Sequence, residues 1–163
     1  MKQLMPLLLF LGSLMTSFAQ LNYGTPMNEP LPEKIQNLRR AIDVIHFPKE
    51  TDPVKIKDTY YWKHLTSIMC KESEIKIIEY GAYIYYNDTW NLRREYPIKE
   101  LNKSFGTKKQ LMNQAEPYTW VNNFRTGTKL YGGWALWYFI GKTSKGETVC
   151  GYAKINTTNN LLN

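Results

Sequence analysis

The stretch Trp134–Ile155, WALWYFIGKTSKGETVCGYAKI, is the part of the chain that most strongly predicts the fold. Two runs rich in aromatic and β-branched residues, 134–141 and 148–155, flank the polar segment KTSKGE at 142–147. Residues of these kinds favour strands, and a short polar loop that contains glycine commonly joins two antiparallel strands. We therefore expect a β-hairpin at the C-terminal end of the domain.

Upstream of this hairpin, several short segments dense in Tyr, Trp and Ile have the composition of strands. They are Thr59–Leu65, Glu74–Tyr80, Ala82–Asn87 and Tyr118–Phe124. Apolar residues alternate with other residues in the second and third segments, which is typical of half-buried antiparallel strands. The sequence therefore predicts a mainly antiparallel sheet, with a turn near Gly81 between these two segments.

Helical signals stand before and between the predicted strands. Apolar residues recur at helical spacing after Pro32, namely Ile35, Leu38, Ala41, Ile42 and Ile45, and predict an amphipathic helix that ends before Pro48. A second helix is expected from Pro97 to Gly106. Thr107 and Gln110 resemble a capping box, which predicts a further short helix that runs to about Glu116. The predicted fold class is thus α+β: a mainly antiparallel sheet with an N-terminal helix and a helical insertion, ending in a C-terminal β-hairpin.

The first nineteen residues have the order of a secretory signal peptide. Lys2 supplies a positive charge, residues 4–11 form an apolar run, and Ser17-Phe18-Ala19 suits cleavage before Gln20. A membrane anchor is the alternative, but the run is short for a span and contains a proline. We expect a signal peptide at 1–19, an extended tether at 20–32 and a single globular domain at 33–163. The expected location is secreted or periplasmic.

The two cysteines, Cys70 and Cys150, both lie in the predicted mature chain. Export into an oxidising compartment favours a disulfide between them, and two buried free thiols are the alternative. The chain contains only two histidines, and none of its cysteines and histidines forms a close ligand pair. We therefore expect no metal and no cofactor.

Positive charge is concentrated in the C-terminal part of the chain. The formal net charge is +7, and residues 101–163 contain eight Lys or Arg residues but only two acidic residues, Glu116 and Glu147. A shared basic face would attract an acidic protein or an anionic glycan, whereas cations dispersed over the surface would only aid solubility. Nucleic acid is not the expected partner, and the oligomeric state is left open.

One local cluster has the residue types of an anion site. Trp90 is followed by Arg93 and Arg94, and Tyr86 closes a tyrosine-rich run just before it. An aromatic ring beside paired guanidinium groups suits a carboxylate or phosphate, whereas the alternative is a solvated pair of loops. The sequence predicts Trp90, Arg93, Arg94 and Tyr86 as candidate ligand-binding residues.

No motif assigns a reaction. His64 lies in a predicted strand, but no nucleophile or metal-binding pattern accompanies it, so we name no catalytic residue. The leading hypothesis is a non-enzymatic binding module, either a protein inhibitor or a binder of an anionic or carbohydrate ligand. Two alternatives remain: a small secreted hydrolase that acts on the cell envelope, and a structural component of a surface assembly.

Overall fold

The computed structural model describes residues 24–26 and 28–162, and the signal peptide predicted at 1–19 lies outside them. Strands hold 56% of the described residues and helices hold 7%. The elements in chain order are α1 (Glu33–Gln36), β1 (Arg39–Arg40), β2 (Ile42–Phe47), β3 (Glu50–Thr51), β4 (Pro53–Ile56), β5 (Thr59–Trp62), β6 (Leu65–Cys70), β7 (Glu74–Tyr86), β8 (Thr89–Glu95), α2 (Glu100–Phe105), β9 (Leu111–Asn113), β10 (Tyr118–Trp120), β11 (Arg125–Gly127), β12 (Gly133–Thr143) and β13 (Thr148–Thr157). The fold is therefore mostly β, and the predicted α+β class is wrong.

The C-terminal hairpin is confirmed and forms the centre of the large sheet. β12 and β13 pair antiparallel from Gly133 opposite Thr157 to Lys142 opposite Thr148. The strand order of this sheet is β1-β13-β12-β7-β8, with β3 also paired to β13 and β9 also paired to β7. Apolar side chains of β12 are buried on both faces, as expected of a central strand.

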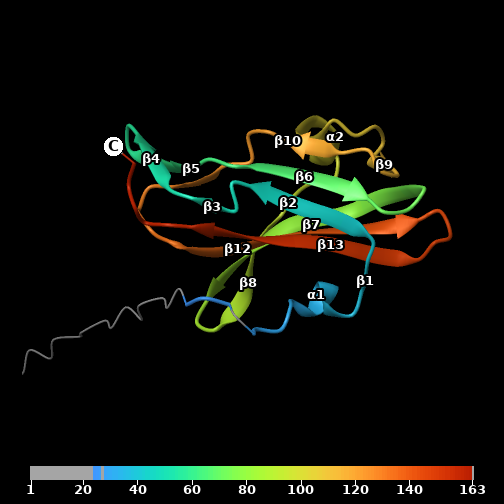
Figure 1. The fold of residues 1–163 in the computed structure, drawn as a ribbon, viewed down its shortest axis with the longest axis horizontal. Helices are drawn as coiled ribbons and strands as arrows, with labels where there is room; N and C mark the ends of the chain where they lie inside the picture. The colour runs from blue at the N-terminus through green and yellow to red at the C-terminus, as the bar shows by residue number, and fades with distance from the viewer. Residues whose placement is uncertain (1–23, 27, 163) are drawn as a thin grey trace, which may run out of the picture.

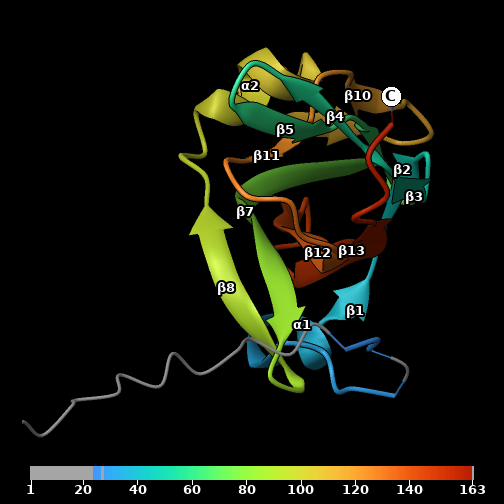
Figure 2. The same ribbon diagram turned by 90° about the vertical axis from the view of Figure 1, so that its left-hand side faces the viewer.

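Two smaller sheets, ordered β10-β6-β2 and β11-β5-β4, complete the described structure. We call the β10-β6-β2 sheet the second sheet. It lies across one face of the large sheet, and α2 lies beside β10 (Figure 1). α1 lies on the opposite side of the long strands (Figure 2). The large sheet is thus covered on both faces, which explains why its central strands carry few polar residues.

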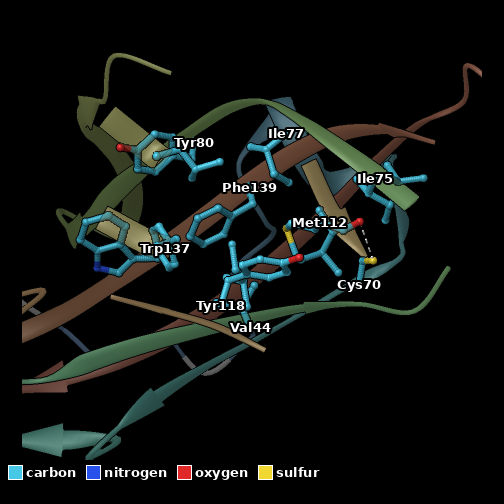
Figure 3. Close-up of a cluster of buried hydrophobic side chains, with 14 of the residues drawn as sticks. Val44, Cys70, Ile75, Ile77, Tyr80, Met112, Tyr118, Trp137 and Phe139 are labelled. Atoms are coloured by element: carbon cyan, nitrogen blue, oxygen red, sulfur yellow. Dashed lines mark hydrogen bonds between the residues drawn. The ribbon is translucent and has the colours of Figure 1, made fainter. Parts of the chain in front are cut away.

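The main core lies between the large sheet and the second sheet (Figure 3). Phe139 of β12 stacks on Tyr80 of β7 with ring centroids 5.8 Å apart. Phe105 of α2 meets Phe139 edge-on at 5.5 Å. Burial of one such side chain contributes about 2–3 kcal/mol. These contacts hold α2 and the large sheet together.

A second core covers the other face of the large sheet. Ile35 of α1 packs there with Tyr138 of β12. The Tyr138 hydroxyl donates to Glu79 Oε1 at 2.7 Å, and Lys34 Nζ lies 2.6 Å from the same oxygen. α1 is therefore held to the sheet by one buried apolar side chain, Ile35, and by the ion pairs of Lys34 with Glu79 and Glu95.

The predicted N-terminal helix is much shorter in the structure. α1 has four residues, and the segment Ile42–Phe47 is strand β2 instead. Within β2, Ile42, Val44 and His46 point inward at every second position and pair with β6. The apolar residues of this segment fit both a helical and an alternating pattern, and β-branched side chains together with a partner strand favour the alternating one.

Gly81 does not mark a turn, because residues 74–86 form one long strand. A Cβ at Gly81 would collide with the Arg94 carbonyl oxygen and would lie 2.8 Å from Tyr138 Cε1. Glycine is thus required for the close approach of β8 and of the Tyr138 ring. A β-bulge between β7 and β12, where Ile78 is the extra residue, changes which side chains of β7 face the main core.

Only one of the two helices expected between residues 97 and 116 is present, and the predicted helical insertion is therefore wrong as a whole. α2 occupies the expected segment and ends at Gly106, which has a left-handed φ of 74°. The short helix expected after Thr107 is absent, and Leu111–Asn113 forms strand β9 against β7. Gln110 has a φ of 62°, and its backbone N–H donates to Asn102 Oδ1, so a turn leads the chain into β9.

The structure does not support the predicted disulfide. Cys70 and Cys150 are free and buried, and they belong to two different cores. The Cys70 thiol donates to the Met112 carbonyl at 3.3 Å (Figure 3). The Cys150 thiol faces the Leu38 carbonyl at 3.6 Å. The large sheet separates the two sulfur atoms because its two faces carry the two cores.

The described part of the expected tether, residues 24–26 and 28–32, contains no helix or strand. It nevertheless contacts the domain, since Leu31 packs on the second core and the Pro26 carbonyl accepts a hydrogen bond from Lys154 Nζ at 3.2 Å. None of the helices among the described residues has the length and apolar character needed to span a membrane.

Candidate functional site

A cavity of about 340 Å³ opens between the large sheet and the segment that leads into β11. Its wall combines an apolar part, which includes Trp137 of β12 and Ile155 of β13, with a polar part. The polar part consists of His64, Arg93, Arg94, Arg125, Thr126 and Thr157. Among the described residues that line the cavity, none carries a carboxylate. The cavity is therefore basic as well as aromatic.

A β-bulge brings two consecutive arginines to the same cavity. Ala82 of β7 pairs with Arg94, and Tyr83 pairs with Leu92, so Arg93 is an extra residue on β8. Side chains alternate between the faces of a regular strand, which would direct neighbouring arginines to opposite sides. The bulge breaks this alternation, and both Arg93 and Arg94 line the cavity.

Arg94 is oriented by an aromatic stack. Its guanidinium carbon lies 4.5 Å from the centroid of the Tyr96 ring. Tyr96 in turn stacks on Trp137, with centroids 5.3 Å apart and planes at 22°. A guanidinium over an aromatic face is attracted by the ring and remains able to donate hydrogen bonds at its edge. The Arg94 side chain is thus ordered before any ligand binds.

Arg125 approaches the cavity from β11 and is also anchored. Its Nη1 donates to Thr157 Oγ1 at 2.5 Å, and the Thr157 hydroxyl donates to the Gly133 carbonyl at 2.8 Å. The guanidinium carbon lies 4.3 Å from the Tyr131 ring centroid. These contacts fix a third positive charge at the cavity wall.

His64 forms part of the same wall and is only 4% exposed. Its Nδ1 lies 3.2 Å from the Trp62 carbonyl oxygen. Burial and, to a smaller extent, the positive charge of Arg125 lower the pKa of His64 to about 4. His64 is therefore neutral near pH 7, and the cavity places a neutral ring beside its arginines.

A buried hydrogen-bond network of His46, Thr66 and Asn123 lies next to His64. The His46 ring meets the His64 ring edge-on, with centroids 5.6 Å apart. The Asn123 amide donates to Thr66 Oγ1 at 2.7 Å, and Thr66 lies 2.9 Å from His46 Nδ1. His46 Nε2 lies 3.3 Å from the Ala153 carbonyl, and burial lowers the pKa of His46 to about 4. Both histidines are therefore held in the neutral form.

The structure separates the ligand-binding residues predicted from the sequence. Arg93 and Arg94 line the cavity, whereas Trp90 is 8% exposed and packs in the second core on the other face of the large sheet. Trp90 meets Tyr85 at 5.2 Å, and Lys154 Nζ lies 5.6 Å from its ring centroid.

Tyr86, the fourth predicted residue, is half-buried and precedes the β7–β8 turn. The Asn91 amide donates to the Tyr86 carbonyl at 3.1 Å, which helps to close this turn. Neither Tyr86 nor Trp90 is among the described residues that line the cavity. The two arginines therefore share the cavity wall with Tyr96 and Trp137 and not with Trp90 and Tyr86.

Sequence reasoning missed Arg125, Thr157 and Tyr96 as site residues. Arg125 lies in a polar segment between two predicted strands, and no local motif connects it to Arg93. The only available signal was the excess of basic over acidic residues after position 100. These residues come together because β11 pairs with β5 and β12 pairs with β7. No local pattern in a single sequence predicts these pairings.

The possible chemistry of the site depends on the groups that surround His64. No carboxylate of the described residues forms a hydrogen bond with His64, so the ring lacks the acidic partner that orients many catalytic histidines. No group of three or more metal-ligating side chains was found among residues 24–26 and 28–162. Comparisons of the chain with protein-family models, with curated proteins and with solved structures found no match.

Proposed function

We propose that this protein is a binding module for a small organic anion, which it holds in the cavity lined by Arg93, Arg94 and Arg125. The observation that carries this proposal is the convergence of three guanidinium groups on a cavity whose described lining contains no carboxylate. Arginine donates two parallel hydrogen bonds to a carboxylate or phosphate, and such charge-assisted bonds are stronger than neutral ones. An anion is therefore the natural complement of this wall.

Two features support a ligand rather than a structural role for these charges. Among the described residues, Arg93 and Arg94 form none of the observed ion pairs with a carboxylate. Stacking on Tyr96 restricts Arg94, so little side-chain freedom is lost when it donates to a ligand. The Arg94 charge is thus ordered in advance, and no observed ion pair of the described residues neutralises Arg93 or Arg94.

The size of the cavity limits the ligand. A volume of about 340 Å³ lies at the lower end of the range of small-molecule sites. It accommodates one ring with an acidic substituent, or the terminal residue of an anionic glycan, better than the interior of a polymer. Trp137 and Ile155 supply apolar surface for the uncharged part of such a ligand.

Calorimetric titration with phenylacetate and its neutral amide, phenylacetamide, tests the proposal, because the two ligands have nearly the same shape and only the acid carries a negative charge and two acceptor oxygens. The acid should bind and the amide should bind at least about tenfold more weakly, since charge-assisted bonds to arginine are lost. Arg94→Gln and Arg125→Gln should each weaken binding of the acid about tenfold.

Lys145→Gln is the matched control, because it removes one positive charge at the β12–β13 turn, at the far end of the hairpin from the cavity. Its affinity for phenylacetate should equal that of the wild type. Equal affinities for acid and amide, or equal losses in all three variants, would contradict a specific anion site.

We also propose that the protein acts outside the cytosol, on the basis of the signal peptide predicted at 1–19. Cell fractionation and mass analysis of the native protein test this location. The expected mature N-terminus is Gln20 in an extracytoplasmic fraction, and a cytosolic protein that begins at Met1 would overturn it.

A further inference from the structure

His64 lines the cavity, and one nitrogen of its ring, Nε2, has no observed hydrogen-bond partner among the described residues. His64 is only 4% exposed, and its Nε2 atom is buried. A buried polar atom normally has a partner, because desolvation without one is costly. An atom of this kind in a cavity wall indicates where a ligand supplies the missing partner.

The hydrogen bond at the other ring nitrogen determines what Nε2 can do. The partner of Nδ1 is the Trp62 carbonyl oxygen, which can only accept, so Nδ1 carries the proton. A neutral imidazole has one N–H, and Nε2 is therefore an acceptor. The low pKa of His64, caused first by burial, keeps the ring in this state near pH 7.

The neighbouring groups do not satisfy this acceptor. The His46 ring approaches His64 edge-on, but the nitrogens of His46 face Thr66 and Ala153. The Arg125 Nη1 is directed to Thr157. The remaining partner for Nε2 is a donor that enters with the contents of the cavity.

We infer that the ligand is a hydroxy acid: a small organic anion whose carboxylate meets the arginines and whose hydroxyl group donates to His64 Nε2. The inference rests on the proposed function and specifies its ligand class. An aromatic hydroxy acid and a sugar acid both have this chemistry. Arg125 belongs to the lining and its charge acts on His64, so the two kinds of contact lie within reach of one small molecule.

Mandelate and phenylacetate are suitable probes, because they differ only by the hydroxyl group next to the carboxylate. The two enantiomers of mandelate are titrated separately, and the tighter one should bind roughly five- to tenfold better than phenylacetate, the gain expected of one hydrogen bond. The same titration with D-glucuronate distinguishes a sugar acid from an aromatic hydroxy acid as the source of the hydroxyl group.

Two substitutions of His64 separate the acceptor from the shape of the site. In His64→Asn the amide nitrogen takes the place of Nδ1 and keeps the bond to Trp62, but the deep acceptor is lost. In His64→Gln the amide oxygen takes the place of Nε2 and keeps an acceptor. The preference for mandelate should vanish in His64→Asn and return in His64→Gln, while both variants still bind phenylacetate and unfold cooperatively.

The outcomes distinguish this inference from the proposed function. Failure of every acid to bind at millimolar concentration would overturn both. Binding of phenylacetate with no gain for either hydroxy acid, or a gain that survives in His64→Asn, would overturn the hydroxy-acid inference and leave the anion site standing. A gain for mandelate or glucuronate that is lost in His64→Asn supports it.

Discussion

Acidification from pH 7 to pH 5 should destabilise the protein strongly, because its only two histidines are both buried. Burial lowers the pKa of His46 and of His64 from 6.5 to about 4. The unfolded chain therefore binds more protons than the folded protein between these values. Above about pH 6.5 the two histidines do not reduce the free energy of unfolding. As the pH falls from 6.5 towards 4, their protonation in the unfolded chain lowers this free energy progressively.

The linkage relation gives the size of this effect. Between pH 7 and pH 5 each histidine lowers the free energy of unfolding by about 2 kcal/mol, so the pair lowers it by about 4 kcal/mol. This is a large part of the 5–15 kcal/mol that is typical of a whole domain. Ordinary carboxyl groups change little in this window, because they titrate near pH 4.

Urea unfolding followed by tryptophan fluorescence measures this change at a series of pH values. The free energy of unfolding should fall steadily from pH 6.5 to pH 5, and the fall should be about half as large in His64→Asn, which removes one of the two titrating groups. A flat profile between pH 5 and pH 7, or an unchanged slope in His64→Asn, would refute the assignment of both rings as neutral and buried.

Three further predictions concern the fold. Gly81→Ala should lower the free energy of unfolding by about 1–3 kcal/mol or more, because its Cβ meets the Arg94 carbonyl and the Tyr138 ring; urea unfolding checks this, and an unchanged midpoint would contradict the close approach of β8. Phe139→Ala should cost about 3–5 kcal/mol, since it empties the centre of the main core; thermal and urea unfolding should agree, and a loss below about 1 kcal/mol would mean that the ring is not packed. Cys70 and Cys150 should react with a thiol reagent only after the protein is unfolded, because both thiols are buried and burial raises the pKa of each. No reductant should be needed for this reaction, and intact mass measures the number of labels. A protein that takes up no label when it is unfolded without reductant would contain the disulfide instead.

The C-terminal hairpin could be predicted because its two runs are long, rich in strand-forming residues and separated by a polar glycine-containing loop. The segment after α1 could not, since its apolar residues offer two patterns: Ala41, Ile42 and Ile45 recur at helical spacing, whereas Ile42 and Val44 alternate as in a strand. A short sequence of this kind is decided by its partner strand, here β6, and by its β-branched residues.

Local sequence patterns predict only part of the candidate site. Arg93 and Arg94 could be predicted as candidate anion-binding residues, but their common face depends on a single extra residue in β8. Without that bulge the pair would point to opposite sides of the sheet. Trp90 is close to both arginines in sequence, but the alternation of the strand places its side chain in the second core. Arg125 and His64 join the site only through long-range strand pairing, which no local pattern encodes.

The central claim is that the arginine-lined cavity holds an organic anion, and an NMR titration tests it most directly. In protein labelled with ¹⁵N, the arginine Nε–Hε signals and the backbone signals of the cavity wall report binding at each position. Addition of phenylacetate should shift the Arg93, Arg94 and Arg125 signals together with those of Ala135 and Thr126, and phenylacetamide should leave them in place. Shifts confined to other surfaces, or identical responses to the acid and the amide, would contradict the claim.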